Sequence, residues 1–303
     1  MDCLVEKAAF SLAAFALVVS PVAAQDDDAY RLAPASHWHL DMAEESCGLQ
    51  RVFGQEGNQV YLQLRQYAPD DSLTVTVASD DVRQRSRLRN FAVTFLPDSE
   101  ANESVRPMAV SSDAFGDGVL FSASLLSAED RARRDEADES DEPFTVPEDA
   151  RNAREQAIES VSIRGQFMRE VVLETGSLHP AMTAMRACMD DLVESWGIDL
   201  ETDSTLSRRV QAVDMDRWTR PITATYPIRS VQRGQQGYIR IRLMVSDEGR
   251  ATDCVVQSAF NDRALDEAAC EGLLRHSRFE PALDAMGSPV ASYWTTVVIY
   301  TLG

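Results

Sequence analysis

Hydrophobic and polar residues alternate along a segment near the C-terminus, and this alternation predicts two paired strands. Between residues 238 and 245 every second side chain is aliphatic, so one face of this strand is expected to be buried. Gly249 follows two acidic residues and supplies the positive φ that a tight turn requires. Residues 252–256 alternate again on the far side of this turn. The pattern therefore predicts a β-hairpin.

An amphipathic helix and a last strand are predicted to complete this unit. Small and aliphatic side chains recur at helical spacing over residues 265–273, after Asn261 and Asp262, either of which can cap a helix. Residues 292–301 are mostly aromatic and β-branched, which is typical of a strand. Residues 219–303 are therefore expected to form a small α+β domain, in which one helix covers an antiparallel sheet.

A longer region, residues 25–201, is predicted to be a β-rich, sandwich-like domain that ends in a helix. Pro180 and Gly197 bracket this helix. The methionines on its stripe form either an adaptable binding surface or part of a core, and they are Met182, Met185 and Met189. The strands are predicted from alternating or continuous apolar runs, which centre on residues 60–64, 73–77, 91–95, 119–123, 161–167 and 171–173.

Two segments are predicted to lie outside the hydrophobic cores. Residues 129–149 contain ten acidic residues and hardly any apolar ones. Such a segment cannot bury enough surface to offset the conformational entropy lost on ordering, so a disordered loop is expected there. Residues 202–218 are predicted to link the two domains.

The first 24 residues have the pattern of a signal peptide. An apolar run is followed by Pro21 and by Val22, Ala23 and Ala24, which offer the small residues that signal peptidase requires before Gln25. Cleavage there would release the chain into the periplasm. Acidic residues outnumber basic ones before the apolar run, so an uncleaved anchor in the inner membrane is the alternative.

Four cysteines remain after such a cleavage, and an even number in an exported chain favours disulfides. Of the possible pairings, one keeps each bond within a single predicted domain. It joins Cys254 on the second hairpin strand to Cys270 on the covering helix, and Cys47 to Cys188 across the N-terminal domain.

Charge and motif content restrict the function. The net charge is −20 at pH 7, which repels phosphate backbones, so no nucleic-acid partner is expected. His37 and His39 share a strand face but have no third ligand nearby, and no nucleophile motif is present, so we expect no metal, no cofactor and no catalytic residue. Arginine occupies every second position over residues 83–89, which indicates either an anion site or a solvated strand edge.

The C-terminal pattern resembles the C-terminal domain of the TonB energy transducers. The resemblance covers about residues 219–303 and rests on six features in register, among them the turn at Gly249 and the Gly-Ser-Pro-Val run over residues 287–290. The residues that carry the match best are Tyr226, Pro227, Gly237, Gly249, Arg278, Phe279 and Pro281.

The resemblance implies a partner and a way of binding it. Domains of this family take a short segment of an outer-membrane receptor, the TonB box, as an added strand at the edge of their sheet, while an inner-membrane motor complex drives the transducer. The last strand is the expected edge because it contains no Lys, Arg or Pro. Alternatively, it is a buried central strand. The residues expected to meet the partner are Tyr293, Thr295, Val297 and Ile299.

The rest of the chain departs from the family. A transducer is expected to have a Pro-rich spacer before this domain, whereas a folded domain is predicted here. Two functions therefore remain open. One is a periplasmic TonB-like protein that engages receptors in energised transport, and the other is an adaptor that uses the same sheet edge without energy coupling.

Overall fold

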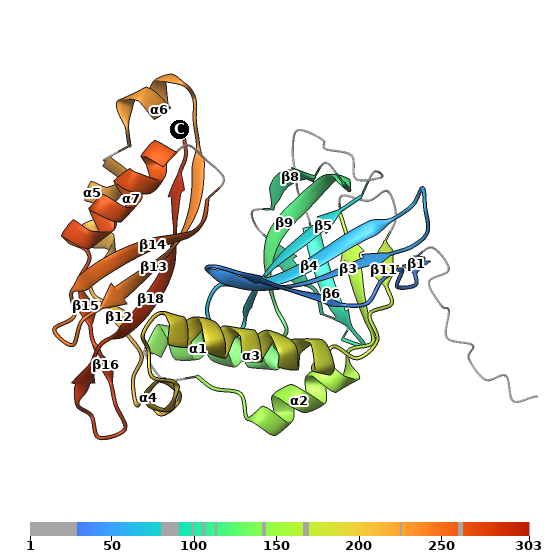
Figure 1. Cartoon of the computed structure of the whole chain (residues 1–303), viewed down its shortest axis with the longest axis horizontal. Coiled ribbons are helices and arrows are strands. Elements are labelled where there is room, and N and C mark those ends of the chain that lie inside the picture. Colours follow the sequence, from blue (N-terminus) through green and yellow to red (C-terminus); the bar gives the residue numbers. More distant parts are fainter. Residues whose placement is uncertain are drawn as a thin grey trace, which may run out of the picture.

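The part of the chain that the structure describes forms two domains (Figure 1), and each has its own hydrophobic core. The structure is a computed structural model, and it describes residues 29–79, 91–98, 100–104, 107–112, 114–140, 144–165, 170–224, 226–259 and 263–302. The predicted signal peptide, the arginine run over residues 83–89 and the two predicted cap residues of the last helix lie outside these ranges. Within them, no helix is both long enough and apolar enough to cross a membrane.

The N-terminal domain is built from two stacked sheets, with the orders β2-β3-β4-β5-β9-β8 and β1-β11-β10-β6-β7. Phe91 on β6 and Phe121 on β9 join the sheets in one core, with their ring centroids 4.7 Å apart. The strands of the six-stranded sheet are β2 (His39–Ala43), β3 (Ser46–Phe53), β4 (Val60–Gln66), β5 (Ser72–Ala78), β9 (Gly116–Ser124) and β8 (Met108–Ser112). Those of the five-stranded sheet are β1 (Tyr30–Leu32), β11 (Val171–Leu173), β10 (Ser160–Arg164), β6 (Phe91–Leu96) and β7 (Asn102–Ser104).

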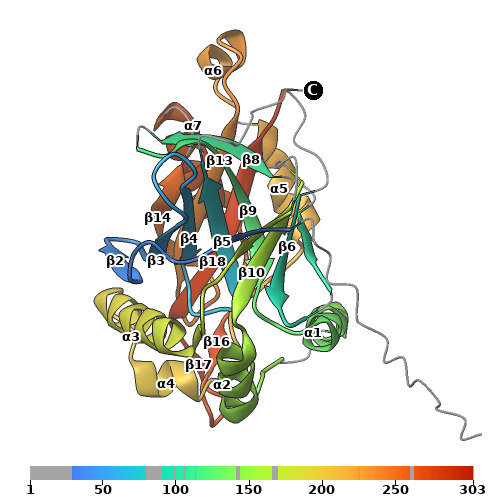
Figure 2. The same cartoon turned by 90° about the vertical axis from the view of Figure 1, so that its right-hand side faces the viewer.

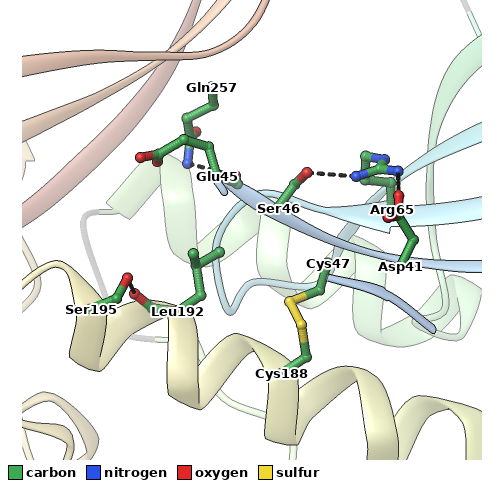
Figure 3. The surroundings of a disulfide bond; sticks show 9 residues. All are labelled: Asp41, Glu45, Ser46, Cys47, Arg65, Cys188, Leu192, Ser195 and Gln257. Carbon is green, nitrogen blue, oxygen red and sulfur yellow. Dashed lines mark hydrogen bonds and ion pairs between the residues drawn. A yellow bond between two sulfur atoms is a disulfide. The ribbon is translucent and has the colours of Figure 1, made fainter. Parts of the chain in front are cut away.

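Helix α3 (His179–Ser195) covers this core beside β3. The stripe of methionines predicted on it is buried among residues of both sheets, so the stripe belongs to the core and is not a binding surface. Cys188 on α3 forms a disulfide with Cys47 on β3, with their Cα atoms 6.1 Å apart (Figure 3). This is the pairing that the sequence predicts.

The prediction of a disordered loop over residues 129–149 is corrected by the structure. Helix α1 (Ala128–Ser140) and helix α2 (Glu148–Ala157) occupy most of this segment. The Ser127 side-chain oxygen caps α1 by accepting a hydrogen bond from the N–H of Asp130 at 3.0 Å. A side-chain cap supplies local stability that a count of apolar residues does not include.

A buried carboxylate ties α2 to α3. The side chain of Glu155 is only 3% exposed, and it accepts a hydrogen bond from Arg186 Nη1 at 2.5 Å. His179 Nδ1 lies 3.1 Å from the other carboxylate oxygen. Paired charges can be buried where isolated ones cannot, so a helix rich in charged residues packs here against the domain.

The C-terminal domain contains the predicted hairpin, helix and last strand. Its main sheet is antiparallel, with the order β14-β13-β18. Helix α7 (Arg263–His276) covers one face, and Cys270 on this helix is bonded to Cys254 on β14, as predicted, with their Cα atoms 5.7 Å apart. The three strands are β13 (Gly237–Val245), β14 (Ala251–Ala259) and β18 (Ser292–Tyr300).

Shorter elements surround this sheet. Helix α5 packs beside α7 on the side of the sheet away from the N-terminal domain (Figure 1). Strand β12 pairs with β15, and β16 pairs with β17. Their bounds are α4 (Leu200–Ser204), α5 (Met215–Ala224), α6 (Ile228–Gln232), β12 (Gln211–Ala212), β15 (Phe279–Glu280), β16 (Ala282–Leu283) and β17 (Pro289–Val290).

The predicted linker over residues 202–218 is also corrected. Val210 and Trp218 are buried in the C-terminal core, and the pairing of β12 with β15 adds this segment to the same domain. The N–H of Ser207 donates a hydrogen bond to the backbone oxygen of Leu283 at 2.9 Å. The C-terminal domain therefore begins near residue 205. As a whole the chain is an α+β protein, as the sequence predicts.

Candidate functional site

Strand β18 lies at one edge of the C-terminal sheet. Among the described strands it pairs only with β13, from Gly237 opposite Tyr300 to Val245 opposite Ser292. Figure 2 shows β18 behind the N-terminal domain, running toward the C-terminus of the chain. An edge strand keeps one row of backbone N–H and C=O groups that no neighbouring strand of its sheet uses. This geometry is the one that strand addition requires.

The four residues predicted to meet a partner occupy different environments along β18. Tyr293 packs edge-on against Trp196, just after α3, with ring centroids 5.1 Å apart. Thr295 and Val297 are half-buried. Ile299 is 38% exposed. The N-terminal domain therefore contacts the beginning of β18, whereas its end is more open.

Tyr293 is held by a polar contact as well. Arg209 is close enough to act electrostatically on the Tyr293 hydroxyl, and it pairs with the buried carboxylate of Asp203 at 3.3 Å. Burial raises the pKa of Tyr293 above that of an ordinary phenol, and the negative charge of Asp203 acts in the same direction. The hydroxyl therefore stays neutral where it lies between β18 and the ion pair of Arg209 with Asp203.

The family-motif residues support the fold of the domain. Gly249 has a φ of 73°, and a Cβ atom built on it would lie 2.0 Å from the backbone oxygen of Phe279. The N–H of Phe279 donates a hydrogen bond to the Gly249 oxygen at 3.1 Å. Only glycine permits this approach, so the hairpin turn and the segment after α7 depend on each other.

The other motif residues also contact the chain's own backbone or core. Tyr226 donates a hydrogen bond from its hydroxyl to the backbone oxygen of Gln235, and its ring lies 5.0 Å from that of Tyr300. Pro227 precedes α6, and Gly237 begins β13.

The motif residues after α7 contact the chain in the same way. Arg278 donates to the backbone oxygen of Ser277 at 2.6 Å, and Phe279 is buried beside Trp218 and Trp294. The backbone oxygen of Pro281 accepts a hydrogen bond from Arg208 at 3.1 Å.

A buried arginine joins the two domains. Arg242 on β13 is 5% exposed, and its Nη2 lies 3.2 Å from the carboxylate of Glu45 in the β2–β3 turn. Its guanidinium carbon lies 4.3 Å from the centroid of the Trp196 ring. The arginine thus contacts two separate parts of the N-terminal domain from the sheet face opposite α7.

Two neighbouring side chains extend this contact. Arg240, also on β13, lies over the ring of Tyr67 at 4.7 Å and reaches Thr74 Oγ1 at 3.5 Å. Gln257 on β14 donates to the backbone oxygen of Tyr67 at 2.8 Å, and Figure 3 shows it beside Glu45. The face of the C-terminal sheet that α7 leaves uncovered is therefore turned toward the six-stranded sheet.

This contact between domains was missed by reasoning from sequence. The signal was the polar side of β13, where arginines at positions 240 and 242 alternate with core residues. Such an arrangement is also common on a solvated strand, so the sequence offered no way to identify Glu45 or Trp196 as partners. Of the predicted histidine pair, His39 begins β2, and the described residues contain no group of three or more His, Cys, Asp or Glu placed to hold a metal ion.

Comparisons with known proteins identify the C-terminal domain. Residues 223–302 match the family model described as Gram-negative bacterial TonB protein C-terminal. A solved structure, the NMR solution structure of the Helicobacter pylori TonB C-terminal domain (residues 179–285), is 15% identical, with 37% of this chain and 92% of that chain covered and a TM-score of 0.22. No curated protein matches the sequence significantly. Residues 223–302 therefore form a domain that belongs to the TonB C-terminal family.

Proposed function

We propose that this chain is a periplasmic TonB-like protein that engages outer-membrane TonB-dependent receptors by strand addition at β18, in energised transport. The observation that carries the proposal is the position of β18 at the sheet edge of a domain of the TonB C-terminal family. The match to a Gram-negative bacterial TonB C-terminal domain supports a location in the cell envelope.

The chemistry of β18 supports this mode of binding. The strand contains no Lys, Arg or Pro over residues 292–300, so nothing in its sequence blocks an incoming strand. The partner's backbone would satisfy the N–H and C=O groups along the free edge, and main-chain hydrogen bonds would supply most of the affinity. The occupant is a short extended segment of a receptor, like a TonB box.

A pair of proline substitutions tests strand addition. Of two neighbouring residues on an edge strand, one directs its backbone groups to the paired strand and the other directs them outward. Thr296→Pro and Val297→Pro, made in the chain beginning at Gln25, should therefore have different effects. One removes a backbone N–H that bonds to β13, and the other removes only a backbone N–H that points outward from the free edge. The variant that keeps its fold should lose capture of outer-membrane receptors, as measured by pull-down from isolated outer membranes.

The controls separate folding from binding. Circular dichroism and the Cys254–Cys270 bond report whether each variant is folded. Thr295→Ser keeps every backbone group, so it should capture receptors as well as the wild-type chain does. Capture that persists in the folded proline variant, or a wild-type chain that captures no outer-membrane receptor, would refute the proposal.

An adaptor without energy coupling is the second candidate. It is favoured by the folded N-terminal domain, which contacts the C-terminal sheet where a transducer is expected to have an extended spacer. The two candidates differ in their attachment to the inner membrane and its motor complex. N-terminal sequencing of the native protein distinguishes them, because a chain that starts at Gln25 favours the adaptor and an intact Met1 favours the energised transducer.

A further inference from the structure

A shallow hollow lies on the outer face of the six-stranded sheet. Its volume is about 240 Å³, and β4, β5, β8 and β9 all contribute side chains to it. Two of its lining residues, Tyr67 and Thr74, are the ones that Arg240 contacts from β13. The hollow is therefore on the face that meets the C-terminal domain, and it is continuous with the contact between the two domains.

The two sheets are arranged in the same lateral order. Gln257 on β14 and Arg242 on β13 both meet the β2–β3 turn, and both strands reach Tyr67, but of these side chains only Arg240 on β13 extends to the beginning of β5. The next strand of the C-terminal sheet is β18, and the next strands of the six-stranded sheet are β9 and β8. A strand added beyond β18 would lie about 4.8 Å further out, in the direction of β9 and β8.

The described side chains that line the hollow are mostly aromatic, hydroxyl, amide or aliphatic groups. At one end of the hollow Arg240 lies over the Tyr67 ring and reaches Thr74. Gln63, Thr76 and Leu120 form one row across it, as the strand register shows. Among the described residues that line it, Arg65 is the only charged one, and it is neutralised by an ion pair with Asp41. Away from Arg240, placing a charged side chain in the hollow would cost desolvation without a compensating partner among the described lining residues.

We propose that the hollow and the edge of β18 form a two-walled groove for one extended peptide. The proposal rests on strand addition at β18 and adds a second wall to it. The backbone of the peptide pairs with β18, and every second side chain points to the six-stranded sheet and enters the hollow. The N-terminal domain thus selects segments with uncharged side chains at these alternate positions, because its described lining away from Arg240 offers aromatic rings, hydroxyls and aliphatic groups.

A charge introduced into the hollow tests this role. The probe is a library of ten-residue peptides with blocked ends, in which each position in turn is Val, Tyr, Glu or Lys. The full chain beginning at Gln25 should prefer Val or Tyr over Glu or Lys at alternate positions. Thr76→Lys should shift the preference at one of these positions toward Glu by about tenfold, and Thr76→Glu should shift it toward Lys.

The matched control uses the neighbouring strand. Val110 lines the hollow, whereas the adjacent Ala109 on β8 is exposed, and successive side chains of a strand point to opposite faces. Ala109→Lys should leave the peptide preferences of the wild-type chain unchanged, and Val110→Lys should alter them as Thr76→Lys does. Unchanged preferences in the folded Thr76 and Val110 variants would overturn the two-walled groove but leave strand addition intact. A wild-type chain that binds no peptide of the library would overturn both proposals.

Discussion

The guanidinium of Arg242 lies against the N-terminal domain, with its carbon 4.3 Å from the centroid of the Trp196 ring. The same group forms an ion pair with Glu45. Arg242→Ala should therefore remove both contacts and leave the Glu45 carboxylate, whose side chain is 20% exposed, without its partner. We expect a loss of about 2 to 3 kcal/mol in the free energy of unfolding and separate unfolding of the two domains in calorimetry.

The control for this experiment is a solvent-exposed ion pair on α7. Arg263 and Glu267 are one helical turn apart, and both side chains are more than half exposed. Arg263→Ala should lower the free energy of unfolding by less than about 1 kcal/mol. The two domains should unfold in this variant as they do in the wild-type chain. Equal effects of the two substitutions would show that Arg242 does not hold the domains together.

The position of the domain boundary can be tested with two fragments. A fragment of residues 205–303 retains β12 and Trp218, whereas one of residues 221–303 lacks both. Because Trp218 is buried against Phe279 and Trp294, its loss should lower the free energy of unfolding by about 3 kcal/mol or more. Urea unfolding followed by circular dichroism measures the difference. If the two fragments are equally stable, the boundary lies nearer to residue 221.

Replacing Gly249 should cost more stability than replacing a glycine that has space for a Cβ atom. Gly249→Ala adds a Cβ atom that would lie 2.0 Å from the Phe279 oxygen, so the backbone must move. Gly287→Ala is the matched control, because Gly287 also has a positive φ, 79°, but a Cβ atom added to it would meet no other atom within 4 Å. We expect the control to cost about 1 kcal/mol through backbone strain alone, and Gly249→Ala to cost at least twice as much, as measured by thermal unfolding of the full chain.

The two disulfides should contribute to stability separately. The Cys47–Cys188 bond closes a segment with a sequence separation of 141 residues, and the Cys254–Cys270 bond one of 16. On the chain-entropy model these are worth about 5 and about 3 kcal/mol, respectively. Replacing each pair by serine and following the unfolding of each domain tests this expectation. If the loss of one disulfide destabilises the other domain more than the domain that contained the bond, this expectation is wrong.

The hairpin, the covering helix, the Cys254–Cys270 bond and the last strand could be predicted from the sequence, because each depends on residues close together in the chain or on a simple period. The Cys47–Cys188 bond spans 141 residues, and its prediction came from keeping each bond within one predicted domain. Alternation fixed the buried face of β13, and the spacing of apolar residues predicted α7. The match of residues 223–302 to a family follows from the same local pattern.

The segment over residues 129–149 shows why composition misled. Ser127, just before this segment, caps α1 by accepting a hydrogen bond from the N–H of Asp130, and α2, which begins within the segment, carries a buried ion pair to α3. Both contacts depend on which residues meet in space. Composition counts charges but does not pair them, so it predicted disorder where the described chain is helical. The short strand β12 was missed for a similar reason, since its partner β15 lies far along the chain.

The sequence by itself determined the small α+β domain, its family and the uncharged character of β18, because these are encoded in local periodicity and in the residues of one strand. The tertiary structure alone decided that β18 is an edge and that Arg242 reaches Glu45 and Trp196. It also decided that the hollow of the N-terminal domain lies on the sheet face that meets the C-terminal domain. Glu45 and Arg242 are separated by 197 residues. No periodicity spans such a distance, so only the packing of the two domains brings these groups together.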